Sequence, residues 1–118
     1  MDGMDLELKA LDNFTGTEQY HNVLLGINAT DGIKYVMENG YSWFVTDAVM
    51  IVIMEKAVKA EDFVKISLEV KDGKATVIYT DGDNRELYRQ KYELTGAKRS
   101  FSIYYDRASN VMLLPSEY

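Results

Sequence analysis

The chain of 118 residues has no cysteine and only one histidine, one proline and one tryptophan. Without cysteine, disulfide bonds and thiolate metal sites are excluded. With one histidine, the usual catalytic triads and histidine-rich metal centres have too few side chains. The longest apolar stretch, residues 43–54, is interrupted by Thr46 and Asp47 and falls short of the roughly 18 residues that indicate a membrane span. The acidic N-terminus lacks the features of a signal peptide, so we expect a cytoplasmic protein.

Hydrophobic residues make up 47% of the chain and charged residues 27%, as in ordinary globular proteins. The length predicts a single domain over residues 1–118. The net charge of −6 is unevenly distributed, because residues 1–62 carry −7 whereas residues 63–118 carry +1 and all four arginines. This asymmetry predicts an acidic face that attracts basic protein surfaces and repels nucleic acid. The simpler interpretation is an ordinary solvated surface.

The first half of the chain, residues 1–62, has mostly helical patterns. A first helix is predicted before residue 15, from the helical spacing of Met4, Leu8 and Leu11. Asp31 is expected to cap a second helix and Gly40 to follow its end, because one face between them is apolar, with Ile33, Val36 and Met37. Between these helices, residues 20–25 form a short apolar run that is typical of a strand.

Residues 43–58 are the most ambiguous segment. Ser42 suits an N-cap, and the helix that would follow is apolar nearly all round, so it would be buried on most sides. A buried strand over residues 49–54 is the alternative. The length of the segment favours the helix, since strands seldom run so long.

The second half of the chain, residues 63–118, has strand patterns. Residues 64–71 alternate between apolar and polar side chains, as in a strand with one buried face. Asp72-Gly73 predicts a type I′ hairpin turn into a strand over residues 74–80. Further strands are expected at 86–95, 100–105 and 111–114. The sequence therefore predicts an α+β domain in which N-terminal helices pack on one face of a mainly antiparallel, five-stranded meander sheet.

Four sequence blocks resemble a bacterial family of unknown function that is also seen on phages and other mobile elements. They are Phe-Thr-Gly-Thr-Glu at residues 14–18 with Tyr20, the block Thr30–Tyr35, Trp43-Phe44 with Asp47-Ala48, and the terminal Leu-Leu-Pro-Ser-Glu-Tyr. The resemblance spans nearly the whole chain. It implies a small α+β fold and a prokaryotic or phage source, and it transfers no activity.

A metal site is not expected, although Glu18 and His21 have the i, i+3 spacing found in di-metal helical bundles. Such bundles need two such pairs and the chain offers one, so a surface or hydrogen-bonded histidine is the better interpretation. Asp47 stands in an apolar run, and its carboxylate must find a donor or face a cleft. We expect a donor from residues 14–18 or a tyrosine hydroxyl. An acid in a functional pocket is the alternative.

The nine tyrosines and one tryptophan are the most suggestive part of the composition. On the predicted strands they favour cross-strand packing. Tyrosine together with arginine is also typical of protein interaction surfaces, and of surfaces on which single-stranded nucleic acid stacks. At the C-terminus, we expect Tyr118 to tuck into the core and hold the last strand, since free termini usually fray unless they are docked. A tail that a partner recognises is the alternative.

The sequence contains no nucleophile-elbow, phosphate-loop or dinucleotide-binding glycine motif, so an enzyme is not expected. The first hypothesis is a small non-enzymatic protein that binds a protein partner stoichiometrically. Its concrete form is an anti-defence (anti-CRISPR-like) inhibitor whose acidic face covers a basic groove on a nucleic-acid-handling effector in a bacterial cell. The alternatives are a small enzyme or ligand-binding domain with a cleft of carboxylates and His21, and a self-assembling module joined through an exposed strand edge.

The candidate partner-binding or motif residues are Thr15, Thr17, Glu18, Tyr20, His21, Asp31, Trp43, Asp47, Glu117 and Tyr118. No cofactor, membrane contact or direct nucleic-acid contact is expected.

Overall fold

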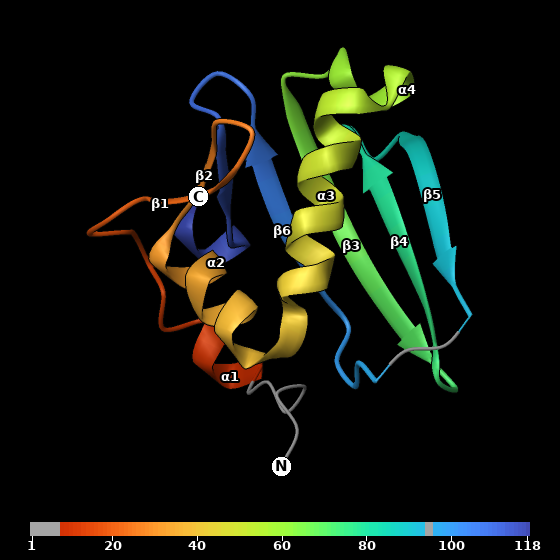
Figure 1. Cartoon of the computed structure of the whole chain (residues 1–118), viewed down its shortest axis with the longest axis horizontal. Helices are drawn as coiled ribbons and strands as arrows, with labels where there is room; N and C mark the ends of the chain where they lie inside the picture. The colour runs from red at the N-terminus through yellow and green to blue at the C-terminus, as the bar shows by residue number, and fades with distance from the viewer. Residues whose placement is uncertain (1–7, 94–95) are drawn as a thin grey trace.

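The computed structural model describes residues 8–93 and 96–118, whose strands form one seven-stranded sheet (Figure 1). The strands are β1 (His21–Leu24), β2 (Ile27–Ala29), β3 (Phe63–Lys71), β4 (Lys74–Thr80), β5 (Glu86–Tyr92), β6 (Phe101–Asp106) and β7 (Val111–Leu113). Their order in the sheet is β1-β2-β7-β6-β3-β4-β5. All neighbours are antiparallel except β2 and β7, which are parallel.

The predicted five-stranded meander is wrong, although the α+β class is correct. The sheet has seven strands because β1 and β2, from the first half of the chain, add to it through β7. The meander ends at β5, and β6 pairs with β3 instead of β5. A physical reason lies in β3, whose side chains Val64, Ile66 and Leu68 are buried. A strand with such a continuous buried face is favoured at the centre of the sheet, with a partner on each edge.

The helices also differ from the prediction, since only one of them is long. The elements are α1 (Leu8–Leu11), α2 (Asp31–Val36), a π-helical turn η1 (Met37–Tyr41), α3 (Ser42–Met54), α4 (Lys56–Lys59) and a 3-10 turn η2 (Pro115–Glu117). Residues 43–58 are helical as favoured, but Glu55 is extended, with φ −76° and ψ 118°, and it separates α3 from α4. Met4 lies outside the described residues.

The starts of α2 and α3 differ from the predicted caps, whereas Gly40 between the two helices has the expected conformation. Gly40 has φ +97°, a left-handed conformation that glycine adopts without strain. It therefore has the backbone expected of a C′ glycine, but the chain turns at this point into α3 without leaving the helical layer. Ser42 is the first residue of α3 and not its N-cap, which is Tyr41. Similarly, Thr30 and not Asp31 is the N-cap of α2.

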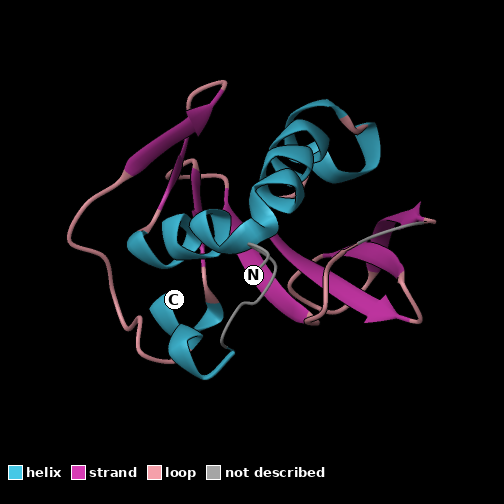
Figure 2. Cartoon of the chain, turned by 60° about the horizontal axis from the view of Figure 1, so that its bottom comes forward, coloured by secondary structure: helices cyan, strands magenta, loops and turns pink. Residues whose placement is uncertain are grey.

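The core lies between α3 and one face of the sheet (Figure 2). Helix α3 is apolar nearly all round, and its inner side is fully buried, with Phe44, Val45, Ala48, Val49 and Val52. The strands β3, β4 and β6 contribute alternate side chains to the same core, including Ile66, Val77 and Ile103. No helix in the described part of the chain has the length and apolar composition needed to cross a membrane.

The structure confirms the predicted hairpin turn at Asp72-Gly73 and shows a local role for Arg107. Asp72 and Gly73 both have positive φ, as the predicted type I′ hairpin requires. Arg107, one of the four arginines in the second half of the chain, donates to the carbonyl oxygens of Val52, Val58 and Glu61. Arg107 therefore ties carbonyl oxygens at the C-terminal ends of α3 and α4 to the residue that follows β6, which is a structural role.

Candidate functional site

The sequence blocks that resemble the known family meet at the N-terminus of α2. Thr30 is the N-cap residue, and its side-chain oxygen accepts a 3.3 Å hydrogen bond from the backbone N–H of Ile33. The hydroxyl of the buried Thr30 donates in turn to Oε1 of Glu117, at 2.6 Å. A threonine at this position therefore caps the helix and also connects it to the C-terminal segment.

The carboxylate of Glu117 is held by three donors. Besides the Thr30 hydroxyl, the backbone N–H groups of Gly32 and Leu114 donate to it at 3.1 Å and 2.9 Å. The 3-10 turn η2 positions this side chain against the first turn of α2. A carboxylate is favourable there because the free N–H groups of a helix N-terminus carry partial positive charge. Glu117 therefore links the end of the chain to α2.

Gly32 is the residue that permits this contact. A Cβ atom at position 32 would lie 2.6 Å from Oε1 of Glu117 and 2.6 Å from Cδ1 of Leu114. Real Cβ atoms do not approach other atoms so closely. The glycine is therefore required by packing, although glycine disfavours a helix.

A second carboxylate, that of Asp31, holds the loop of residues 14–19. Its Oδ1 lies 2.8 Å from Nε2 of His21, and its Oδ2 accepts from the backbone N–H of Glu18 at 3.0 Å. The Asp31 backbone N–H donates to the hydroxyl oxygen of Thr17, which itself donates to the carbonyl of Gln19. The hydrogen bond from His21 is the main cause that lowers the pKa of the Asp31 carboxyl. This arrangement favours the ionised form of Asp31.

A polar hollow of about 310 Å³ lies beside these two networks. Its walls come from the loop of residues 16–20, from the β6–β7 turn and from the C-terminal segment, and they include Thr17, Tyr20, Thr30, Asp106, Ser109 and Glu117. Both acids in the wall already accept hydrogen bonds from the protein. The hollow could therefore admit a small polar or cationic molecule, but its carboxylates are not free bases.

The side chains of the remaining N-terminal candidates are not part of the two networks. The side chains of Thr15 and Glu18 are exposed, and Tyr20 is 62% exposed at the rim of the hollow. Only the backbone of Glu18 takes part, through its bond to Asp31. In this part of the chain, the side chains of Thr17 and His21 make the bonds, and partner binding by these candidates stays a prediction.

Asp47 and Trp43 belong to a different part of the molecule. Tyr92 of β5 donates a 2.7 Å hydrogen bond to Oδ2 of Asp47, as the prediction of a tyrosine partner stated. The rings of Trp43 and Tyr92 are in edge contact, with centroids 5.3 Å apart. Because β5 and β1 are opposite edges of the sheet, Asp47 does not share a cleft with His21. Of the carboxylates considered for a cleft with His21, Asp47 therefore lies apart, whereas Asp31 contacts the His21 ring.

Buried polar atoms near the β4–β5 pair lack a partner. The hydroxyl of Tyr79 and Oε1 of Gln90 accept or donate no hydrogen bond within the described protein atoms. Burial raises the pKa of the Tyr79 hydroxyl strongly. Sites of this kind are usually satisfied by ordered water.

Tyr118 packs on the sheet face opposite α3. Its ring centroid lies 5.2 Å from that of Phe63 and 5.6 Å from that of Tyr104. The residue nevertheless remains 79% exposed. The prediction that Tyr118 tucks into the core is therefore wrong, because its ring only contacts two aromatic rings on the outer face of the sheet.

Within residues 8–93 and 96–118, no group of three or more histidine, aspartate or glutamate side chains is arranged to hold a metal ion. Thr30 and Gly32, which belong to the network, were not among the candidate residues of the sequence analysis. The available signals were a threonine directly before a helix and a glycine in its first turn, where a helix gains nothing from glycine.

Comparison with known proteins gives a family but no activity. No curated protein and no solved structure matches the chain. The model of a family of unknown function, DUF6876, matches residues 5–118 and therefore contains all of the sequence blocks described above. The chain belongs to the DUF6876 family.

Proposed function

We propose that the protein is a small non-enzymatic binding protein that acts by stoichiometric contact with a protein partner. The observation that carries this proposal is the outer side of α3. Met50 and Met54 lie one helical turn apart and are 37% and 65% exposed. Ile51 and Ile53 beside them are half-buried. Apolar side chains at i and i+4 on an uncovered helix face are typical of helix-in-groove recognition.

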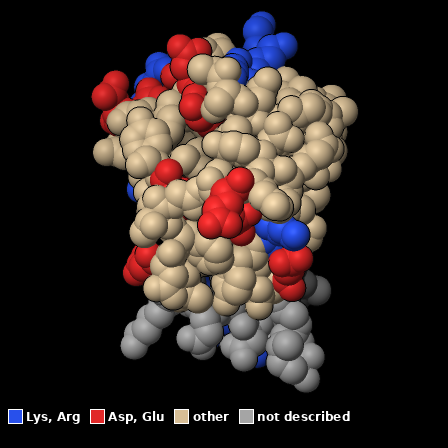
Figure 3. Space-filling model, turned by 90° about the vertical axis from the view of Figure 1, so that its left-hand side faces the viewer, with Lys and Arg blue, Asp and Glu red and all other residues tan. Residues whose placement is uncertain are grey.

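The charges beside this helix face indicate the kind of partner. Asp47 lies one turn before Met50, and Glu55, the C-cap of the helix, directly follows Met54. An apolar groove with a basic rim would match this pattern. Figure 3 shows that, on the side of the molecule with β1 and β2, the acidic side chains form separate patches in a mostly uncharged surface that also carries some basic side chains. This dispersion favours apolar anchoring with a few charge contacts over extended mimicry of a nucleic acid.

In its more specific form, the proposal is an inhibitor from a phage or other mobile element in a bacterial cell. The partner would be a nucleic-acid-handling effector, such as a CRISPR nuclease, whose basic surface the acidic half of the chain covers. The support is the charge of −7 over residues 1–62. Contacts between exposed charges are screened by salt, so the affinity should fall as ionic strength rises.

The test uses tagged protein and nuclease-treated lysate of the organism that encodes the chain. Met50→Gln together with Met54→Gln removes the apolar anchors while keeping long, helix-compatible side chains. The matched control is Leu25→Asn, which removes a 61% exposed apolar side chain at a turn with positive φ, where asparagine is tolerated. We expect one stoichiometric protein with the wild type and the control, and its loss with the double variant. A protein retained equally by all three chains would contradict the role of α3.

A second candidate function is supported by the polar hollow beside Glu117. Its volume of about 310 Å³ and its wall of hydroxyl and carboxylate groups suit a small cationic or polyhydroxylated metabolite. A thermal-shift screen of such metabolites tests it, with Tyr20→Ala as the variant, because Tyr20 lines the hollow and makes no bond to the structural networks. A compound that stabilises the wild type and Tyr20→Ala equally would bind elsewhere.

A further inference from the structure

Strand β6 loses its neighbour on one side part of the way along its length. β3 pairs with β6 from Phe101 to Asp106, whereas β7 pairs with it only from Tyr104 to Asp106. Continuing the β6–β7 register would place Pro115 opposite Ser102. Pro115 instead begins η2, and proline has no backbone N–H to donate. The only proline of the chain therefore stops the ladder before it reaches Ser102.

The backbone groups of Ser102 point toward this gap. The backbone N–H groups of Asn28 and Thr30 donate to the carbonyl oxygens of Asn110 and Met112. Because the backbone groups of successive strand residues point to alternate sides, Leu113 faces β6, where it pairs with Tyr104. Two residues earlier in β6, the N–H and C=O of Ser102 have the same direction, away from β3. No group within residues 8–93 and 96–118 forms a hydrogen bond with them.

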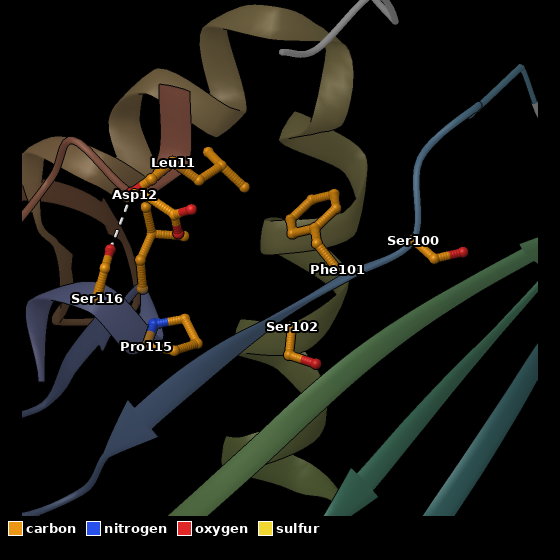
Figure 4. A pocket seen from close by; sticks show the side chains of 8 residues that line it. Leu11, Asp12, Ser100, Phe101, Ser102, Pro115 and Ser116 are labelled. Carbon is orange, nitrogen blue, oxygen red and sulfur yellow. Dashed lines mark hydrogen bonds between the residues drawn. The ribbon is translucent and has the colours of Figure 1, made fainter. Parts of the chain in front are cut away.

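A pocket of about 230 Å³ lies against this free edge (Figure 4). It is formed between the end of α1, the start of β6 and the turn η2, with a lining that includes Leu11, Asp12, Phe101, Ser102, Leu114 and Pro115. Cavities of about 150 Å³ already hold a benzene ring, so this pocket has room for one large apolar side chain.

The walls of the pocket are fixed by the protein itself. The hydroxyl of Ser116 donates a 2.9 Å hydrogen bond to the carbonyl of Leu11, which joins η2 to α1 (Figure 4). The hydroxyl of Ser102 bonds to that of Ser67, at 2.9 Å. The lining groups that remain for a ligand are therefore the apolar side chains, the backbone of Ser102 and the exposed carboxylate of Asp12. A preformed pocket lowers the entropic cost of binding.

We propose that this pocket binds a short extended segment of a partner protein. The segment pairs with the backbone N–H and C=O of Ser102 as an added strand, inserts one apolar side chain between Phe101 and Pro115, and places a basic side chain near Asp12. In strand addition, main-chain hydrogen bonds give affinity and side-chain pockets give specificity. This site is separate from the outer side of α3 and goes beyond the contact proposed there.

The test begins with a display library of random octapeptides selected against the full chain. The enriched peptide is synthesised, and each of its backbone nitrogens is methylated in turn. We expect methylation at one position, the residue paired with Ser102, to weaken binding by about tenfold or more, because it removes a hydrogen bond and leaves the C=O of Ser102 unpaired. Methylation at the two neighbouring positions should be tolerated, since their N–H groups point outward.

Substitutions in the protein test the same proposal independently of changes in the peptide. Asp12→Lys, at an exposed position, should weaken a peptide with a basic residue about tenfold, whereas Asp83→Lys, a matched change at an exposed turn, should not. Ser102→Pro should abolish binding, provided that its melting curve shows a folded chain. Met50→Gln with Met54→Gln should leave peptide binding unchanged, which separates this site from the α3 contact. A library without an enriched peptide, or a peptide that tolerates methylation at every position, overturns the proposal.

Discussion

The hydroxyl of Thr30 donates a 2.6 Å hydrogen bond to the carboxylate of Glu117, which is 87 residues further along the chain. Thr30 is at the same time the N-cap of α2, so a single side chain caps a helix and fixes the C-terminal segment. The contact joins two of the sequence blocks, residues 30–35 and the C-terminal Leu-Leu-Pro-Ser-Glu-Tyr, in the folded chain. It also means that the last residues of the chain stabilise the domain, as free termini do only when they are docked.

Glu117→Gln tests this contact by changing one oxygen to an amide nitrogen. The carboxylate accepts from three donors, and an amide can accept through only one of its two ends, so at least one backbone N–H loses its partner. We expect the free energy of unfolding to fall by about 2–3 kcal/mol, as for hydrogen bonds to charged groups. Chemical denaturation measures it. Glu18→Gln is the matched control, because the Glu18 side chain is exposed, and it should change stability by less than about 0.5 kcal/mol.

Gly32→Ala should destabilise the protein although alanine favours helices. The added methyl group would lie 2.6 Å from both Glu117 and Leu114, so the C-terminal segment must move. Overpacking of this kind costs about 1–3 kcal/mol. In a chain that already carries Glu117→Ala, one of the two clashes is removed and the cost should be smaller. Equal costs in the two backgrounds, measured by urea denaturation, would show that Gly32 does not act through Glu117.

Asp31→Asn should change the pH dependence of stability. The pKa of Asp31 is lowered in the folded protein, chiefly by His21, from an ordinary value of 3.8. The ionised carboxylate therefore stabilises the folded state fully above that value, and this contribution is lost as pH falls through the folded pKa. We expect the difference in Tm between wild type and Asp31→Asn to be fully present above pH 3.8 and to shrink as the pH falls below that value.

His21→Ala provides the control for this pH dependence. Removing the imidazole takes away the main cause of the lowered pKa, so the Asp31 carboxyl should titrate nearer its ordinary value. In that background, the Tm difference caused by Asp31→Asn should disappear at a higher pH than in the wild type. A difference that is constant from pH 7 to pH 2 in either background would contradict a stabilising role of the charge.

The local parts of the fold could be predicted from the sequence, and the order of the strands could not. Period-two alternation over residues 64–71 and the Asp72-Gly73 turn are set by neighbouring residues, and β3, β4 and their hairpin follow them. Placing β6 beside β3 depends on which distant strand covers which edge. Nothing in the sequence of β6 distinguishes a β5 partner from a β3 partner, because both would leave Ile103 and Tyr105 in the core.

In the candidate site, too, the residues could be chosen from the sequence, but their long-range partners could not. Thr17, Asp31 and Glu117 belong to the sequence blocks, whereas His21 was a candidate as the only histidine of the chain. The structure places these four residues around the N-terminus of α2. Their partners could not be assigned, since each of these bonds except Thr17–Gln19 joins residues that are at least 10 apart in the chain or depends on the turn η2. Ser102 was not selected, because its importance comes from where β7 ends and not from its side chain.

The hydrogen bond between Tyr92 and Asp47 supports the last prediction. Asp47 lies in an apolar helix, and the Tyr92 hydroxyl is its donor, at 2.7 Å. Asp47→Ala should lower the free energy of unfolding by about 1–3 kcal/mol, because the Tyr92 hydroxyl, in a partly buried position, loses its acceptor. Tyr92→Phe keeps the ring against Trp43 and removes only the hydroxyl. If the two groups act through this bond, the double variant should be destabilised by about 0.5 kcal/mol or more below the sum of the single effects. A melting temperature that Asp47→Ala leaves unchanged would remove the structural role and leave Asp47 as a surface acid beside the methionines of α3.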